Sequence, residues 1–173
     1  MKMQISEALE KLLPAFGQYY TINKDTPVTP FLAEAEFRSH NEQYFLVRSA
    51  HIADIDSNEF VYFAGVPVLD DKTLLELTSK AWDTGLAKVK PHEGHRNSDI
   101  TLFILADKLE ETVKTSIKKT KLYKSYKFSF WGWSNFKLAV AELSNQGIYS
   151  NRLGKDYRKL LEKNIFNKGV AKK

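Results

Sequence analysis

Apolar residues at the start of the chain recur at the three- and four-residue spacing of an amphipathic helix. Ile5, Leu9 and Phe16 share one face, and Ser6 is the kind of residue that caps a helix start, so the pattern predicts a first helix. Residues 21–30 contain two prolines among polar side chains and predict a connection that leads into a strand.

Strand-like alternation begins near residue 31 and continues to residue 65. Polar segments at 41–43 and 57–58 divide this stretch and predict three consecutive antiparallel strands, which begin near Phe31, Tyr44 and Phe60. The first strand has an apolar side, made of Phe31, Ala33, Ala35 and Phe37, and a polar side, made of Glu34, Glu36, Arg38 and His40. A turn at 41–43 would place Glu36 opposite Arg48 and allow a salt bridge.

A longer helix is predicted over residues 72–89, because Asp70 and Asp71 suit a helix start and apolar side chains follow at helical spacing. Its expected buried face consists of Leu75, Trp82, Leu86 and Val89. The next strand, residues 99–106, contains the run ITLFILA. The lack of alternation in this run predicts a strand that is buried on both faces, at the centre of the sheet.

Another helix is predicted to begin at Asp107, because Asp107 and Glu110 have the spacing of a capping box. Leu109, Val113 and Ile117 recur every four residues and form its narrow apolar seam. Its other faces are polar and rich in lysine.

Aromatic and polar residues alternate over residues 125–130, which predicts a half-buried strand. We expect its core side to consist of Tyr126, Phe128 and Phe130. Two further strands, residues 136–143 and 148–151, are joined by a predicted turn at 144–147. A last helix is predicted from the spacing of Tyr157, Leu160, Leu161 and Ile165.

These elements predict a single α+β domain over residues 1–173, with residues 167–173 as a frayed basic tail. The expected sheet is mixed, with an antiparallel three-strand meander and a buried central strand. Helices pack on it, in the element order α-β-β-β-α-β-α-β-β-β-α.

Composition narrows the class of protein. The chain has no cysteine, which excludes disulfides, thiolate zinc sites and cysteine nucleophiles. No apolar run reaches the length of a membrane span, and the N-terminus does not resemble a secretion signal. We therefore expect a cytoplasmic protein without a membrane partner.

The net charge of +5 hides an uneven distribution of charge. Residues 1–107 contain 10 Lys/Arg and 16 Asp/Glu, whereas residues 108–173 contain 16 and 5. Clustered lysines attract phosphates, so one interpretation is a basic face that binds nucleic acid or an acidic protein. The alternatives are lysines on solvated faces, or two halves that neutralise each other within one chain or between the subunits of a homodimer.

The candidate polyanion-binding residues are Lys114, Lys118, Lys119, Lys121, Lys124, Lys127, Arg152 and Lys155. Aromatic residues lie among these lysines, and such a mixture can stack bases and neutralise phosphates. If the aromatic residues of the predicted strand face the core, however, only Lys127 and one of Trp131 and Trp133 remain for a ligand.

We assign no catalytic residue, because neither a nucleophile elbow nor a P-loop occurs. His92 and His95 lie three residues apart, near Glu93 and Asp99, and these residue types can bind a divalent metal. A neighbouring proline and glycine disrupt any helical register, so a solvated loop is the better interpretation.

Residues 131–155, WGWSNFKLAVAELSNQGIYSNRLGK, combine Gly-Trp-Ser, an apolar strand, an acidic-Leu pair and Ser-Asn-Arg-Leu-Gly-Lys. This pattern resembles one found in small uncharacterised bacterial and archaeal proteins, a family of domains of unknown function. The resemblance implies a shared fold and no transferable activity.

The element order of residues 1–106 also resembles, at the level of fold, the restriction-endonuclease-like core. Those enzymes place an acid on the second strand and Glu/Asp-x-Lys on the third, to hold Mg²⁺ and assist the attacking water. Asp54, Asp56 and Glu59 stand near these places, but residues 60–65 contain no lysine. The metal ligands under this alternative are Asp54, Asp56, Glu34 and Glu36, and no cofactor other than Mg²⁺ is expected.

The leading hypothesis is a non-catalytic module whose basic C-terminal half contacts nucleic acid or an acidic protein partner. A divergent metal-dependent phosphodiesterase and a homo-oligomeric structural protein are the alternatives.

Overall fold

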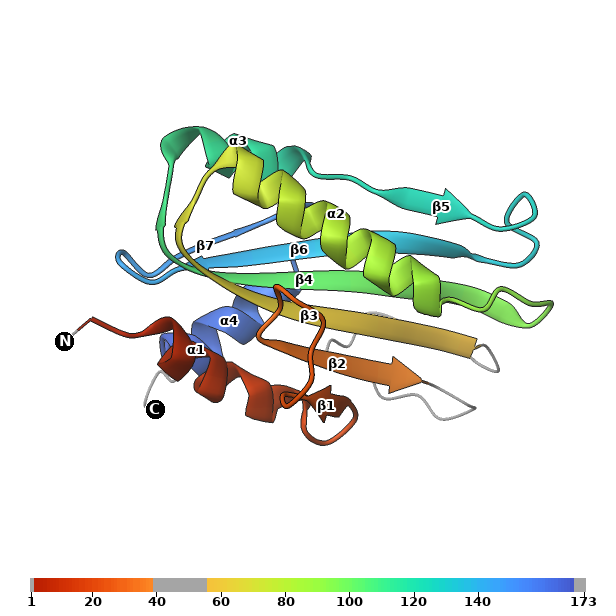
Figure 1. Ribbon diagram of the computed structural model, residues 1–173, viewed down its shortest axis with the longest axis horizontal. Helices are drawn as coiled ribbons and strands as arrows, with labels where there is room; N and C mark the ends of the chain where they lie inside the picture. The colour runs from red at the N-terminus through yellow and green to blue at the C-terminus, as the bar shows by residue number, and fades with distance from the viewer. Residues whose placement is uncertain (1, 39–55, 170–173) are drawn as a thin grey trace.

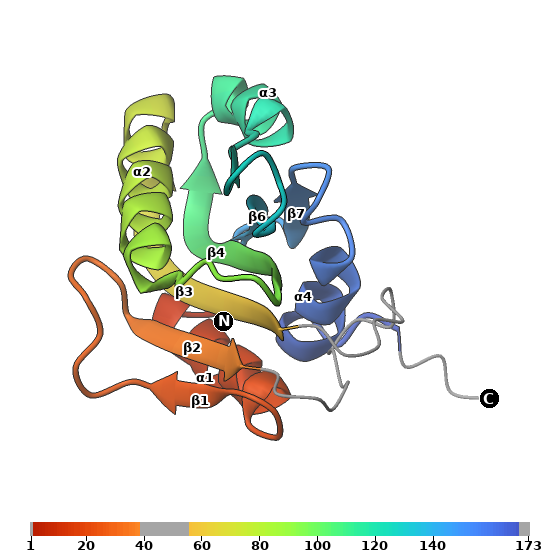
Figure 2. The same cartoon turned by 90° about the vertical axis from the view of Figure 1, so that its right-hand side faces the viewer.

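The computed structural model describes residues 2–38 and 56–169. Its strands are β1 (Thr21–Asn23), β2 (Ala33–Arg38), β3 (Asp56–Leu69), β4 (His95–Leu109), β5 (Tyr123–Ser125), β6 (Trp133–Glu142) and β7 (Gly147–Ser150). Its helices are α1 (Ile5–Leu12), the 3-10 turn η1 (Leu13–Phe16), α2 (Asp71–Lys88), α3 (Glu111–Lys119) and α4 (Tyr157–Ile165). Helices α2 and α3 cover one face of the sheet, and α1 and α4 cover the other (Figures 1 and 2). The predicted α+β class and element order are confirmed.

The strand order is β1-β2-β3-β4-β6-β5, with β7 also paired to β6. Strands β1, β2 and β3 form an antiparallel meander, whose first strand differs from the predicted one. Strands β3, β4 and β6 are parallel, and α2 and α3 make the two crossovers between them. Strands β5 and β7 pair with opposite ends of β6, at residues 133–135 and 139–142. Strand β4 is therefore central and buried on both faces, as its sequence predicts.

Several predicted strand boundaries differ from the structure. Residues 21–23 form strand β1 within the predicted connection, and the predicted turn at 57–58 lies inside β3, because β3 pairs with β4 from Asp56 onward. Phe31 precedes β2 and packs on the α2 face, whereas the next apolar residues of β2 pack on the α1 face. The predicted strand over residues 44–55 and the Glu36–Arg48 pair lie outside the described residues.

The helix starts also required correction. Gln4 is the N-cap of α1, and Ser6 lies inside the helix. The expected capping box does not form, because β4 continues through Asp107 to Leu109 in register with β3, and α3 begins only at Glu111. The predicted cap of α2 is confirmed, since the Asp70 carboxylate accepts a 2.7 Å hydrogen bond from the backbone N–H of Thr73.

The buried face of α2 is offset from the predicted one. Leu74, Leu77 and Ala81 are buried against the sheet, while Leu75 is 67% exposed. The other three predicted residues, Trp82, Leu86 and Val89, are only partly buried at the edge of this core.

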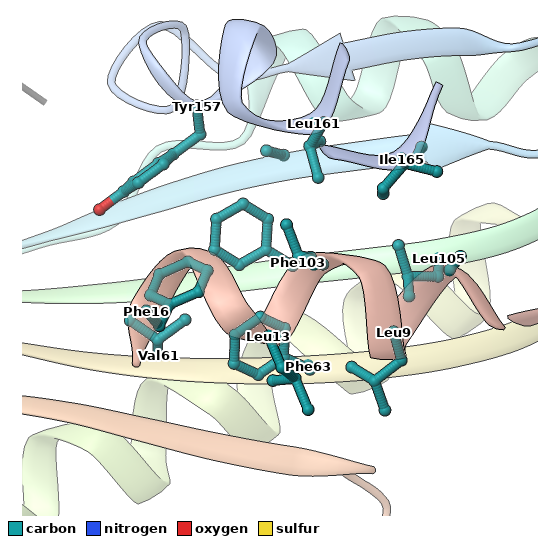
Figure 3. Close-up of a cluster of buried hydrophobic side chains, with 14 of the residues drawn as sticks. Leu9, Leu13, Phe16, Val61, Phe63, Phe103, Leu105, Tyr157, Leu161 and Ile165 are labelled. Atoms are coloured by element: carbon teal, nitrogen blue, oxygen red, sulfur yellow. The ribbon is translucent and has the colours of Figure 1, made fainter. Parts of the chain in front are cut away.

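A group of aromatic side chains packs within the core between the sheet and helices α1 and α4 (Figure 3). The Phe63 and Phe103 rings stack on neighbouring strands with centroids 5.4 Å apart. The ring of Phe16 meets both of them edge-on, at 5.3 and 5.7 Å. Leu161 and Ile165 of α4 are fully buried on the same face. The first and the last helix of the chain thus pack on the same side of the sheet.

Alanine substitutions of two neighbouring leucines test which face of α2 is buried. We expect Leu74→Ala to lower the free energy of unfolding by about 2–5 kcal/mol, because it leaves a cavity in the core. Leu75→Ala should change it by no more than about 0.5 kcal/mol, because its side chain lies in water. Urea unfolding of both variants measures the difference, and a larger loss for Leu75→Ala would contradict the observed face.

Candidate functional site

Positive side chains follow one edge of the sheet. Helix α3 ends at Lys119, and the chain continues into β5, the edge strand, all of whose residues are exposed. It then turns back into β6 at the right-hand end of the sheet in Figure 1. We use the name basic strip for the cations of this path and the arginine beside it: Lys118, Lys119, Lys121, Lys124, Lys127 and Arg152.

The first part of the basic strip surrounds a cavity of about 160 Å³. Its lining residues are Lys118, Lys119, Thr120, Lys121, Phe136, Asn151, Arg152 and Leu153. The structure therefore brings four of the predicted polyanion-binding residues together from two segments that are more than thirty residues apart in the chain.

The buried side chain of Asn151 fixes the geometry of this cavity. Its amide NH₂ donates to the carbonyls of Thr120 and Phe136 at 3.1 and 3.0 Å. Its amide oxygen accepts from the backbone N–H groups of Leu138 and Gly154 at 3.0 and 2.8 Å. Asn151 thus ties the end of α3 to the turn that carries Arg152. Sequence reasoning missed this role, although Asn151 and Gly154 belong to the C-terminal motif.

Four predicted residues do not line the cavity: Lys124 and Lys127 lie farther along the basic strip, and Lys114 and Lys155 lie outside it. The Lys114 ammonium lies 3.0 Å from a carboxylate oxygen of Glu111 and 5.4 Å from the centre of the Tyr149 ring. The hydrogen bond to Glu111 raises the pKa of Lys114. Lys155 is exposed in the turn before α4.

Within the described part of the chain, no member of the basic strip forms an ion pair with a carboxylate. Four acidic residues of the first half instead pair with cations of that half: Glu7 with Lys11, Glu10 with Lys24, Glu36 with Arg38 and Lys88, and Asp107 with Lys2. Among described residues, Lys137–Asp99 is the only ion pair that joins the two halves.

The aromatic residues after β5 form a hairpin loop, which we call the aromatic loop, residues 126–132. The predicted strand over 125–130 is wrong, because β6 begins at Trp133, opposite Ser125, and the chain must reverse between them. Lys127, Phe128 and Ser129 all have positive φ angles, of 46°, 53° and 69°. Phe128 is 95% exposed and Phe130 is 83% exposed, so both side chains lie in water rather than in the core.

His95 holds the aromatic loop against the sheet. It is buried in β4 rather than in a solvated loop as predicted, and its Nδ1–H donates to the Trp131 carbonyl at 2.7 Å. Its Nε2 accepts from the Ser98 hydroxyl at 2.8 Å. Gly132 passes close to this strand with a φ of 81°, and a Cβ there would lie 2.0 Å from the Arg96 carbonyl oxygen. Both contacts join residues that are far apart in the sequence, so no local sequence pattern could predict them.

A second group of polar side chains lies on the α1/α4 face, which we call the polar cluster: Tyr20, Glu59, Asp99, Thr101, Lys137 and Tyr157. Glu59 is 4% exposed, and its carboxylate accepts hydrogen bonds from Tyr20 at 2.6 Å, from Thr101 at 2.7 Å and from Tyr157. The hydroxyl of Tyr157 points away from the other labelled residues of α4 (Figure 3). Both carboxylate oxygens of Glu59 are thus hydrogen-bonded.

The rest of the polar cluster is an ion pair. Lys137 lies 2.8 Å from Asp99, and the other carboxylate oxygen of Asp99 is buried without a hydrogen-bond partner. Burial lowers the pKa of Lys137, but the nearby carboxylates of Asp99 and Glu59 outweigh this effect and raise the pKa overall. Lys137 therefore stays charged.

The metal ligands of the endonuclease alternative are only partly described. Glu34 and Glu36 lie on the same side of β2; Glu34 is buried, and Glu36 is paired with Arg38 and Lys88. Asp54 and the side chain of Asp56 lie outside the described residues, so this set stays a prediction. Within the described residues, no three His, Cys, Asp or Glu side chains form a group that could hold a metal.

The fold and site define an α+β protein whose sheet edge carries a basic strip and an exposed aromatic loop. The chain belongs to the family described as a domain of unknown function (DUF8052), whose model matches residues 4–163. No curated protein and no solved structure matches the chain. None of the described helices is both long and apolar enough to cross a bilayer. Function must therefore be argued from the site.

The hydrogen bonds to Glu59 predict a fall in stability at alkaline pH. Burial, with the nearby Glu59 charge, raises the pKa of Tyr157 and Tyr20 in the folded protein. Their contribution to stability is complete below the unfolded-chain tyrosine pKa of about 10 and is lost progressively as the pH rises above it. Urea midpoints between about pH 8 and pH 11 measure this loss. The urea midpoint should fall less steeply with pH in Tyr157→Phe than in the wild-type protein, and equally steeply in Tyr123→Phe. Equal slopes in the wild-type protein and both variants would show that Tyr157 does not cause the loss.

Gly132→Ala tests the contact between the aromatic loop and β4. We expect it to displace the loop and to lower the free energy of unfolding by about 1–3 kcal/mol, because the new Cβ meets the Arg96 carbonyl at a strained φ. Trypsin cleavage after Lys124 or Lys127 should become faster. Gly17→Ala is the control, since its φ is −63° and its Cβ would meet only ordinary contacts. Equal cleavage rates in the two variants would contradict a close contact between the aromatic loop and β4.

Proposed function

We propose that this protein is a non-catalytic module that binds nucleic acid through the basic strip. The observation that carries the proposal is the cavity at the end of α3. Lys118, Lys119, Lys121 and Arg152 line this cavity, and none of them is paired with a carboxylate of the described chain.

Electrostatics supports a polyanion as the missing partner. Like charges held close together repel each other, and a phosphate between them removes this repulsion while it releases condensed counterions. Lys124 and Lys127 continue the charge along β5 and into the aromatic loop, beyond the reach of a single small anion. A linear chain of phosphates fits this arrangement better than one isolated anion does.

The alternative of internal neutralisation is weakened by the ion pairs. Four acidic residues of the first half are engaged with cations of that half, and one described pair crosses between the halves. An acidic protein surface or a second subunit remains a competing partner for the basic strip. Light scattering at low and high salt distinguishes the homodimer, because a dimer held by charge would dissociate as salt rises.

A lysine triple variant tests the proposal directly. We expect Lys118→Gln/Lys119→Gln/Lys121→Gln to weaken binding to labelled DNA and RNA, with its fold unchanged, because it removes the cations of the cavity. The slope of log affinity against log salt concentration should decrease in magnitude by roughly 2 to 3. This change corresponds to roughly one phosphate contact per lysine. Fluorescence anisotropy across a salt series provides both quantities.

The matched control is Lys72→Gln/Lys80→Gln/Lys90→Gln, which removes the same charge from exposed positions outside the basic strip. It should keep nearly all the affinity and the full salt slope. An equal loss in both triple variants would show that only net charge matters. No binding by the wild-type protein to any nucleic acid at low salt would remove the proposal.

A further inference from the structure

The tip of the aromatic loop exposes two large apolar rings inside the basic strip. Phe128 and Phe130 are the most exposed large hydrophobic residues among those described, at 95% and 83%. Leaving such a side chain in water forgoes the free energy that its burial would supply. Lys124 precedes the rings and Lys127 lies beside them, so apolar and positive surfaces alternate along this edge.

The backbone under these rings is strained and tightly bonded. Three successive residues, none of them glycine, adopt positive φ angles, which are sterically unfavourable for L-residues. Backbone hydrogen bonds hold this shape: Tyr126 to Gly132 at 2.9 Å, Phe130 to Lys127 at 3.0 Å, and Trp131 to Tyr126 at 3.1 Å. A strained backbone that directs apolar side chains into water is typical of a preorganised binding site.

The other aromatic residues of the loop are already engaged. The ammonium of Lys127 lies 3.4 Å from the centre of the Trp131 ring and covers one of its faces. Tyr126 hydrogen-bonds to the Ser134 hydroxyl at 2.9 Å and packs edge-on against His95. Phe128 and Phe130 are therefore the rings of the loop with open faces, and Tyr123 on β5, which precedes the loop, is 54% exposed.

We propose that Phe128 and Phe130 stack on unpaired bases, so that the ligand of the basic strip is single-stranded nucleic acid. This inference rests on the proposed function and specifies its substrate class. Bases inside a duplex have their faces covered by their neighbours, whereas unpaired bases offer them to aromatic side chains. Aromatic rings that alternate with lysines suit a single strand of any sequence.

The shape of the charged surface favours a strand over a lipid surface. Lysines that anchor a loop tip to a membrane would surround the tip. Here the cations instead continue away from the tip, along β5 to the cavity at the end of α3. That linear arrangement matches the spaced phosphates of an extended strand.

The test is Phe128→Ala/Phe130→Ala, probed with labelled oligothymidine and oligouridine of about 15 nucleotides and with a duplex of the same length. We expect at least about a tenfold loss of affinity for both single strands. Duplex affinity should not change. The salt slope for single strands should also stay the same, because aromatic contacts release no counterions. Phe128→Tyr/Phe130→Tyr should retain affinity, and Leu75→Ala, which removes an exposed apolar side chain elsewhere, should have no effect.

Two outcomes would overturn the inference. One is unchanged affinity of the alanine variant for single strands while the lysine triple variant still loses binding, which would leave the proposed function intact. The other is loss of binding to phosphatidylserine/phosphatidylcholine vesicles with single-strand binding unaffected, which would make the loop a membrane contact. If the lysine triple variant binds every nucleic acid as well as the wild-type protein, the proposed function itself fails.

Discussion

The rest of the structure depends on the carboxylate of Glu59. An ionised carboxylate inside a sheet face is costly unless hydrogen bonds replace its water, and here three hydroxyl groups do so. They come from residues 39, 42 and 98 positions away in the chain, so one side chain holds the segment after η1, the central strand and the start of α4 together. The apolar part of the same face is closed by α1 and α4 only if Tyr20 and Tyr157 keep these positions. Removing Glu59 would therefore leave several buried hydroxyl groups unpaired as well as a cavity.

The sheet that Glu59 stabilises also determines where the basic strip lies. Because β4 and β6 are parallel, α3 must cross over the sheet between them, and it ends above β6. The chain then has only the free edge of β6 available, where β5 pairs with residues 133–135. Consecutive residues from Lys118 to the aromatic loop are thereby laid out along one edge. The lysines therefore follow one another along the surface in the same order as in the sequence.

The sequence was informative where local pattern and tertiary context agree. The uninterrupted run at 99–106 predicted the central strand, and Asp70 predicted the start of α2. It misled where tertiary pairing took precedence over local signals. Asp107 and Glu110 have capping-box spacing, yet pairing with β3 keeps Asp107 in a strand. Phe128 and Phe130 have strand spacing, yet the reversal into β6 and the contact with His95 make their segment a loop. The candidate lysines were found from charge alone, but their cavity depends on Asn151, whose partners are up to 31 residues away.

The role of Asn151 separates the structural residues of the C-terminal run from its charged ones. In the run Ser-Asn-Arg-Leu-Gly-Lys, Asn151 forms four hydrogen bonds, and Gly154 approaches the Leu138 carbonyl so closely that a Cβ would lie 2.3 Å from its oxygen. These two residues are required by packing, and neither needs a ligand. Arg152 lies between them with its side chain exposed at the cavity, so the structural part of the motif fixes the position of its one cation. Asn151 and Gly154 thus hold Arg152 at the same cavity as Lys121, and no bound anion is needed for this arrangement. Folding alone therefore accounts for Asn151 and Gly154, whereas the proposed binding depends on the exposed residues of the basic strip and the aromatic loop.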